Sequence, residues 1–340
     1  MKKVIAILLL AFCFLPRCTG CVKNTGDTTV NIDPSNYISV TLTKYNNEED
    51  ISDGMTTQIW CYDIKTEVAS CVFEFATTAQ YSLGFYERGT GKVYYVQRVY
   101  QSMTNYGDQI FVFDPKTGKA SQLTNDFFAV NYVIPWEKRL YFVAELKEER
   151  ATKLGYLDLE TSERFFWRDD SDTLVEGITI DTELNKIFVI AYSLAERNQN
   201  LMSQTSDDFL IPKHSVYVLD MDLDTKETVF EENWWIRTVM TNRTTHTLDM
   251  ICDKKYNTSD IPSTIVTYSF DTKELLYDTW DAPRLEGKDP NYSNEGAAIY
   301  GVASLAEQRG LVECNLLDHS IKLCMETPLG SFINNVYVVP

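Results

Sequence analysis

Apolar and polar positions along this chain repeat a β-strand pattern. Residues 108–126, DQIFVFDPKTGKASQLTND, show one copy: a run rich in Val, Ile and Phe, a tight turn, and a second run. Val, Ile, Tyr and Phe favour strands, whereas Asp, Gly and Pro favour the turns between them. No window shows a sustained helical period. The pattern predicts antiparallel strands joined by short turns.

Six segments share this hairpin pattern, and they span residues 58–75, 109–124, 153–167, 215–232, 264–280 and 310–326. Their turns align on Thr66, Thr117, Thr161, Thr225, Thr272 and His319, at intervals of 44 to 64 residues. The longest interval contains a polar insert at 196–213. Upstream strand-like runs bring the second to fifth repeats to four antiparallel strands. Self-similarity at about 40–50 residues with four strands per unit is typical of β-propeller blades.

The first repeat lacks an innermost strand. Its strands are expected at 37–45, 58–63 and 68–75, whereas the C-terminal run 332–339 has no partner of its own. Because a propeller ring ties its first blade to its last, we expect 332–339 to supply the missing strand. The predicted fold is an all-β, six-bladed β-propeller with four-stranded blades. A seven-bladed ring stays open, since the innermost strand of the last repeat is poorly defined within 282–296.

The repeat at 109–124 resembles that of TolB-like six-bladed propellers. The matching residues are the strand that ends at Asp114, the turn 117–119 and the segment 122–124. The other copies are degenerate, with Ser, Lys or Ile in place of Gly118. The resemblance covers the mature domain as architecture and only one repeat in detail. It implies a binding or scaffolding module; some propellers of this group are associated with hydrolases, so the fold alone does not settle function.

The N-terminus has the features of a secretory signal. Two lysines precede an apolar stretch, residues 4–15, which is too short to span a bilayer as a stable helix. Residues 18–21, Cys-Thr-Gly-Cys, resemble the bacterial lipobox, whose last cysteine receives a diacylglycerol before cleavage. The resemblance implies a lipoprotein, with acyl chains such as palmitate attached at Cys21. Cys18 departs from the pattern, since leucine is usual there. An ordinary signal cleaved near Gly20 is the alternative.

These features predict three parts: a signal peptide at 1–20, a flexible tether at 21–36, and a single propeller domain at 37–340. The protein is therefore expected to be extracytoplasmic and attached to a membrane through a lipid anchor alone. The formal net charge is −18, and removal of the basic signal makes it more negative. Such a charge argues against nucleic acid as a partner and against electrostatic binding to anionic lipid. We expect a monomer.

Four of the remaining cysteines are arranged in two pairs. Cys61 and Cys71 flank the turn of the first hairpin, and Cys314 and Cys324 flank that of the sixth, each five residues from the aligned position. Facing positions on paired strands can form disulfides, and export makes oxidation permissible. The alternative is that they are small buried apolar residues, as Cys252 is expected to be. A zinc site is less favoured, because the spacing is not that of a zinc knuckle.

Motifs of catalysis or metal binding are scarce. The chain has three histidines and lacks the HExxH and GxSxG motifs, so we predict no catalytic residues, metal or cofactor. Asp220, Asp222, Asp224 and Glu231 occupy positions 1, 3, 5 and 12 of a calcium-loop template. Thr225 stands where that loop needs glycine, and the stretch is also the fourth copy of the hairpin. An acidic β-turn is the favoured interpretation.

Loop length predicts which face of the propeller binds. The connections between second and third strands are long in four blades, at 46–56, 101–108, 196–213 and 253–263, and the turns of the opposite face are short. Elaborated loops on a rigid scaffold often bind partners. We therefore expect a binding or scaffold module for a protein, peptide or glycan. The alternatives are a lactonase- or lyase-type enzyme, with carboxylates and a metal converging at the central channel, and an accessory or sensor subunit.

Overall fold

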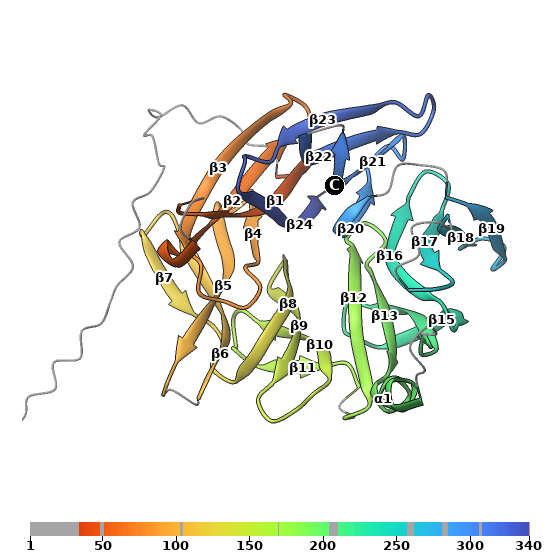
Figure 1. Ribbon diagram of the computed structural model, residues 1–340, viewed down its shortest axis with the longest axis horizontal. Helices are drawn as coiled ribbons and strands as arrows, with labels where there is room; N and C mark the ends of the chain where they lie inside the picture. The colour runs from red at the N-terminus through yellow and green to blue at the C-terminus, as the bar shows by residue number, and fades with distance from the viewer. Residues whose placement is uncertain are drawn as a thin grey trace, which may run out of the picture.

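Six blades of four antiparallel strands each surround a central axis in the computed structural model (Figure 1). The structure describes residues 34–47, 51–102, 105–168, 170–203, 210–256, 262–280, 285–305 and 308–339. The prediction of six blades is confirmed, and the described residues form no seventh blade. No helix in these ranges is long and apolar enough to cross a membrane. Cys21 and the predicted signal peptide lie outside the described residues.

Each blade is ordered from the axis outward. The first has β24 (Ser331–Val339), β1 (Tyr37–Tyr45), β2 (Met55–Asp63) and β3 (Val68–Ala76). The second has β4 (Gly84–Glu87), β5 (Lys92–Tyr100), β6 (Tyr106–Asp114) and β7 (Lys119–Gln122). The third has β8 (Phe127–Trp136), β9 (Arg139–Leu146), β10 (Thr152–Asp158) and β11 (Arg164–Phe166).

The remaining three blades follow the same order. The fourth has β12 (Thr173–Asp181), β13 (Lys186–Ser193), β14 (His214–Asp220) and β15 (Thr225–Glu232). The fifth has β16 (Trp235–Asn242), β17 (Thr247–Asp253), β18 (Thr264–Ser269) and β19 (Leu275–Thr279). The sixth has β20 (Glu286–Tyr292), β21 (Ala298–Leu305), β22 (Gln308–Asn315) and β23 (Ile321–Glu326). A short 3-10 turn, η1 (Ile51–Asp53), precedes β2.

The C-terminal strand closes the ring, as predicted. β24 pairs antiparallel with β1, from Tyr37 opposite Val339 to Lys44 opposite Ser331. It also meets β20 of the sixth blade, in parallel, at Asn335. The first and sixth blades therefore share one continuous sheet of eight strands. This arrangement pairs the inner edge of the first blade and ties the two ends of the propeller together.

Apolar side chains from neighbouring blades form the core. Between the fourth and fifth blades, for example, Phe188 and Val216 pack in one cluster with Val239 and Met250. All four are fully or almost fully buried. Because each blade is covered by a neighbour on both faces, its middle strands are apolar on both sides. This explains why runs such as β13, KIFVIAYS, show little alternation.

The helix α1 (Leu194–Ser203) corrects the expectation that the chain has no helical segment. It lies within the polar insert between β13 and β14. No residue of α1 is buried, so no apolar stripe could reveal it in the sequence. Its first turn is held from outside: the backbone N–H of Ala195 donates to Asp172 and that of Glu196 to Ser193, at 2.7 and 3.1 Å. Such capping stabilises a short helix.

The recurring turn has one conformational requirement. In the first, second, third and fifth blades the residue after the aligned threonine adopts a positive φ, at Glu67, Gly118, Ser162 and Lys273. Only glycine adopts this conformation without steric cost, because it lacks a Cβ. The turn of the second blade, which has Gly118 at this position, therefore adopts the conformation without steric cost. The other three place larger residues in the same geometry, which explains why their sequences look degenerate.

Candidate functional site

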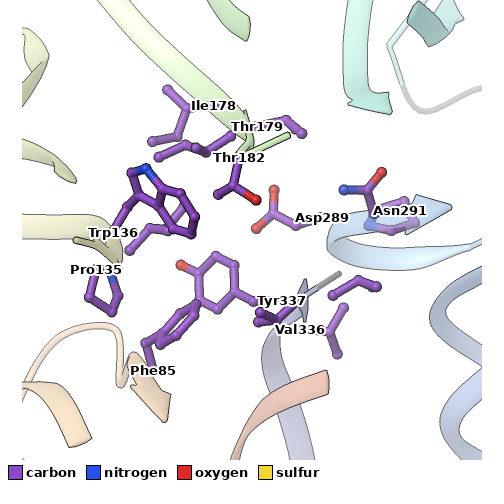
Figure 2. Close-up of a pocket in the computed structure, with 15 residues that line it drawn as sticks. Phe85, Pro135, Trp136, Ile178, Thr179, Thr182, Asp289, Asn291, Val336 and Tyr337 are labelled. Atoms are coloured by element: carbon purple, nitrogen blue, oxygen red, sulfur yellow. The ribbon is translucent and has the colours of Figure 1, made fainter. Parts of the chain in front are cut away.

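A pocket lies at one mouth of the central channel, and we call it the channel pocket (Figure 2). It is formed where the innermost strands of five blades converge, by Phe85 of β4 and by the C-terminal parts of β8, β12, β20 and β24. Four of these strands, β4, β8, β12 and β20, lead into the short turns between first and second strands. The space open to the centre of a water molecule is about 80 Å³. The pocket is thus narrow and is lined by innermost strands.

The walls of the channel pocket are mostly apolar and aromatic. Phe85 of β4 and Tyr337 of β24 are buried, with ring centroids 5.3 Å apart. Trp136 and Ile178 add walls from the third and fourth blades. In Figure 2 these side chains face a common space. Pockets of this composition bind apolar groups and depend on a few polar atoms for orientation.

Asp289 supplies the principal polar group. It lies on β20, adopts a positive φ of 69°, and sits where the pairing of β20 with β21 shifts register. The hydroxyl of Tyr132 donates a hydrogen bond to its Oδ1 at 3.1 Å. Burial, and then the charge of Asp289, raise the pKa of Tyr132 well above its usual range, so this hydroxyl stays a donor. The same two causes raise the pKa of Tyr337.

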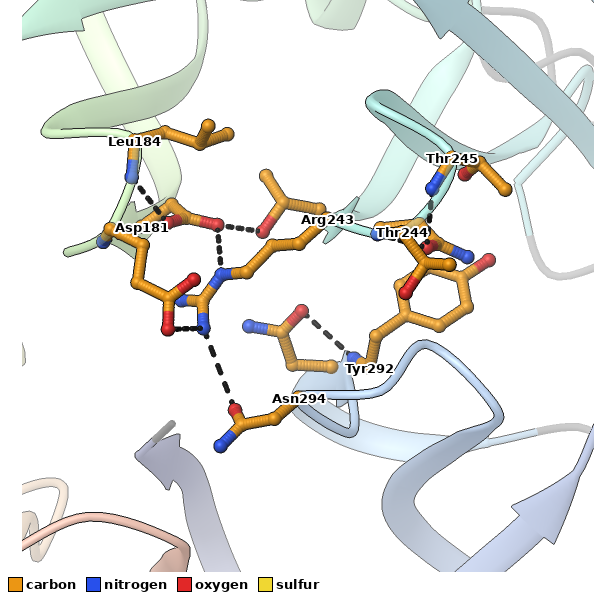
Figure 3. Close-up of polar contacts among 11 residues, drawn as sticks. Asp181, Leu184, Arg243, Thr244, Thr245, Tyr292 and Asn294 are labelled. Carbon is orange, nitrogen blue, oxygen red and sulfur yellow. Dashed lines mark hydrogen bonds and ion pairs between the residues drawn. The ribbon is translucent and has the colours of Figure 1, made fainter.

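An ion-pair network stands behind the rim of the channel pocket (Figure 3). Arg243 of the fifth blade lies 2.9 Å from Asp181 of the fourth, through Nε and Oδ2. Asp181 also accepts from Thr241 and from the backbone N–H of Leu184, at 2.7 and 2.9 Å. Burial raises the pKa of Asp181, but these donors outweigh it and the net pKa is lowered. The next residue, Thr182, lines the pocket.

The network continues to the beginning of the propeller domain. Arg243 contacts Oδ1 of Asn294 in the sixth blade, and Asn294 donates to Asn36 just before β1. The fourth, fifth and sixth blades and the segment that precedes β1 are joined in this way on one face of the propeller. The network contacts the ends of β12 and β20, which are two of the strands that line the channel pocket.

The predicted long loops lie on the opposite face. The channel pocket opens among the turns between first and second strands, while connections such as 46–54 and 194–213 leave the other end of the blades. Parts of these loops lie outside the described residues. Loop length could not reveal the pocket, because its lining comes from strands rather than loops. That the face with the long loops binds a partner stays a prediction.

The four carboxylates of the calcium-loop template do not come together. Asp220 accepts from the backbone N–H groups of Asp222 and Asp224 and pairs with Lys226 at 2.6 Å. Glu231 lies on β15 and contacts Ser215 instead, at 3.1 Å. The favoured interpretation as an acidic β-turn agrees with this geometry, since Asp at the start of a turn accepts from the residues that follow. Among the described residues, no group of three His, Cys, Asp or Glu side chains is placed to hold a metal ion.

The cysteine pairs do not occupy facing positions, which corrects the premise of the disulfide prediction. Cys71 lies opposite Trp60, while Cys314 lies opposite Ile321. Each turn is centred N-terminal to the residue used for the alignment, so equal spacing does not give equal register. No disulfide joins the five described cysteines in this structure. The disulfides Cys61–Cys71 and Cys314–Cys324 stay a prediction, for which non-reducing peptide mapping is the test.

The residues of the channel pocket were not singled out by sequence reasoning. Tyr132, Trp136 and Tyr337 belong to ordinary strand patterns, in which aromatic residues usually serve the core. Asp289 lies in the segment 282–296. The poor strand pattern of this segment was the one feature of the sequence that could have drawn attention to it. The enzyme hypothesis required several carboxylates at the channel. Among the described lining residues, Asp289 is the one carboxylate.

Comparisons with known proteins agree with the fold. The chain is similar to the structure of TolB from Acinetobacter baumannii, with a TM-score of 0.54, 15% identity, and coverage of 90% of this chain and 68% of that one. A nidogen/laminin complex gives a TM-score of 0.50 at 8% identity, covering 88% and 97% of the two chains. An oligogalacturonate lyase in complex with manganese gives 0.46 at 13% identity, covering 74% and 75%, and this likeness carries no argument about function.

No protein-family model matches the chain, and no curated protein sequence matches it. The structural likeness at these low identities therefore concerns architecture alone. The chain has a TolB-like, six-bladed β-propeller fold with four antiparallel strands in each blade.

Proposed function

We propose that the protein is a lipid-anchored, extracytoplasmic binding module whose channel pocket takes a positively charged segment of a partner protein or peptide. The observation that carries the proposal is Asp289, held by Tyr132 at the mouth of a pocket with aromatic walls. Three properties of the chain support it: the sign of the charge, the shape of the pocket and the N-terminal sequence.

The charge favours a cationic group. Asp289 lines the same pocket as the rings of Trp136 and Tyr337, and both a carboxylate and the face of an aromatic ring attract cations. The whole chain carries a formal charge of −18, so its long-range field attracts positive partners. A lysine or arginine side chain also has an apolar stem, which suits the aliphatic walls.

The shape favours a chain segment. About 80 Å³ is open to water centres, too little for a folded surface but sufficient for part of a side chain or a chain end. The walls belong to innermost strands, so the pocket is formed before binding, and a preformed site loses little conformational entropy when it is occupied.

Titration of peptides tests this proposal. Unstructured dodecapeptides that differ only in a central lysine, arginine, glutamate or alanine are titrated by fluorescence anisotropy. We expect the basic peptides to bind, and Asp289→Asn to weaken them at least tenfold. The matched control is Glu137→Gln, which removes the same charge from an exposed turn beside the pocket and should leave affinity unchanged. Equal binding of all four peptides, or no effect of Asp289→Asn, would contradict the proposal.

The proposed lipid anchor and extracytoplasmic location can be tested separately. Cys21→Ala removes the residue that a lipoprotein pathway would acylate. We expect this variant to leave the detergent phase in a Triton X-114 partition and to appear in the soluble extracytoplasmic fraction. Cys18→Ala is the control and should stay with the membrane. Membrane retention of Cys21→Ala would show that the anchor is not at this residue.

A further inference from the structure

A second cavity lies on the opposite face, and we call it the loop-face pocket. Its walls come from the first and third blades and from the connection between β3 and β4. About 250 Å³ is open to water centres, roughly three times the space of the channel pocket. Nothing in the proposed function uses this cavity.

The lining of the loop-face pocket is uncharged. Besides Tyr81, six side chains with hydroxyl or amide groups line it: Thr43, Thr77, Gln80, Ser82, Asn131 and Asn334. The others are Met55, Ala79, Tyr81, Leu83 and Phe332. Hydroxyl and amide groups both donate and accept hydrogen bonds. None of these described lining residues is Asp, Glu, Lys, Arg or His, so the lining does not select an ion.

Asn334 is presented by a β-bulge. The pairing of β24 with β1 shifts between Thr41 and Leu42, which leaves Asn334 as the extra residue. Bulges of this kind often redirect a side chain at a functional site. The amide nitrogen of Asn334 donates to the carbonyl oxygen of Ser82 and, at 3.0 Å, to Thr43. Because a carbonyl can only accept, the orientation of this amide is determined, and its Oδ1 points elsewhere as an acceptor.

Two buried polar atoms of this pocket have no hydrogen-bond partner among the described residues. They are Oδ1 of Asn334 and the hydroxyl oxygen of Ser82, and Ser82 is 4% exposed. An unsatisfied buried polar atom costs about 1–3 kcal/mol, so native structures rarely keep one without a reason. A ligand hydroxyl group that came within hydrogen-bond distance of either atom would satisfy it.

Tyr81 provides an apolar surface beside these groups. The residue is 57% exposed although it lines the pocket. An exposed aromatic ring next to hydroxyl and amide groups offers one flat apolar contact together with directional hydrogen bonds. A sugar ring has the complementary surface, with C–H groups on its face and hydroxyl groups at its edge.

We propose that the loop-face pocket binds a neutral saccharide. The ring would pack on Tyr81, and its hydroxyl groups would donate to Oδ1 of Asn334 and exchange hydrogen bonds with Ser82. The uncharged lining argues for a neutral sugar over a uronic or sialic acid. This site is separate from the channel pocket, so saccharide and peptide are expected to bind independently.

The test uses oligosaccharides of glucose, mannose, galactose and N-acetylglucosamine, each titrated into the purified protein by isothermal calorimetry. We expect at least one neutral oligosaccharide to bind at millimolar concentration or below. Tyr81→Ala should weaken that binding at least tenfold. Ser82→Ala removes a hydroxyl that has no partner among the described residues, so it should weaken binding severalfold without lowering the unfolding midpoint. A merely structural role for Ser82 would leave affinity unchanged.

Two control variants test whether the saccharide binds in the loop-face pocket. Tyr100→Ala removes an exposed ring from the same face outside the pocket and should not alter affinity. Asp289→Asn should weaken peptide binding at least tenfold and leave saccharide affinity unchanged, so either proposal can fail alone. Failure of every oligosaccharide to bind at 10-fold molar excess and millimolar concentration overturns the proposal. Saccharide binding that is unchanged in both Tyr81→Ala and Ser82→Ala would also overturn the proposal.

Discussion

The hydroxyl of Tyr132 lies 3.1 Å from Oδ1 of Asp289, although the two residues are 157 positions apart in the chain. Tyr132 belongs to the third blade and Asp289 to the sixth, which are opposite each other in a six-bladed ring. This hydrogen bond therefore spans the channel. It joins two halves of the ring and orients the carboxylate that the channel pocket presents.

Removal of the Tyr132 hydroxyl should weaken the ring. Tyr132→Phe keeps the buried aromatic ring but takes the donor from a carboxylate, and hydrogen bonds to charged groups contribute about 1.5–3 kcal/mol. We expect the free energy of unfolding in urea to fall by about 2 kcal/mol. The exposed Tyr100, changed to Phe, is the control and should have no effect. An unchanged stability of Tyr132→Phe would show that the bond across the channel contributes nothing.

The Arg243–Asp181 pair should make stability depend on pH. Arg243→Met leaves the buried carboxylate of Asp181 without its cation, and breaking such pairs costs about 3 kcal/mol or more. The pKa of Asp181 is lowered in the folded protein. Its contribution is therefore complete above the unfolded pKa of about 3.9, and it is lost as the pH falls through the lower folded pKa.

Urea titrations of Arg243→Met and of the parent protein at pH 7 and near pH 3 measure this effect. The difference in unfolding free energy should be about 3 kcal/mol at pH 7 and should shrink in acid. Lys138→Met is the control, since its pair with Glu160 is largely exposed and should contribute under about 1 kcal/mol. A difference that stays constant with pH would exclude Asp181 as the titrating partner.

The position of β24 predicts how the chain can be rearranged. Deletion of 331–340 should abolish cooperative unfolding, because it removes the inner strand of the first blade and exposes the edge of β1. Val339 lies opposite Tyr37, so the same strand can be placed ahead of β1 through a short glycine-containing turn. We expect this permuted chain to recover a cooperative transition by circular dichroism. Failure of the permuted chain, with a soluble deletion variant, would contradict this closure.

The buried thiols should react slowly. Burial raises the pKa of Cys61 and of Cys314 to about 11. At pH 8 each holds roughly two orders of magnitude less thiolate than a thiol of pKa near 9, and only the thiolate reacts. Iodoacetamide should therefore modify both far more slowly in the reduced native protein than in urea, as followed by mass spectrometry. Equal rates in the two states would place these thiols at the surface.

Much of the fold could be predicted from the sequence because blades repeat locally. The six turns, from Thr66 to His319, marked the six outer hairpins, and the unpartnered run at 332–339 indicated ring closure. Both predictions were confirmed. The strands and turns of a blade are encoded by residues that are close together in the sequence, so the repeat is visible there. α1 was missed for the opposite reason. Its residues bury nothing, and its caps at Asp172 and Ser193 include one contributed from another loop.

Two features could not be predicted from the sequence: the register of the paired strands, and which distant side chains meet in the folded protein. Equal spacing of Cys61 and Cys71 suggested a facing pair, but the position of the turn centre decides which residues face each other. The spacing of residues likewise gave no sign that Tyr132 meets Asp289.

By itself, then, the sequence determined the local elements of this protein and their number: strands, turns, six repeats and a displaced last strand. Only the tertiary structure decided which side chains share the channel pocket and the loop-face pocket. The physical reason is that strand patterns depend on neighbours along the chain, whereas each pocket depends on the angle at which separate blades meet around the axis. Tyr132 and Asp289 become partners only when the ring is closed.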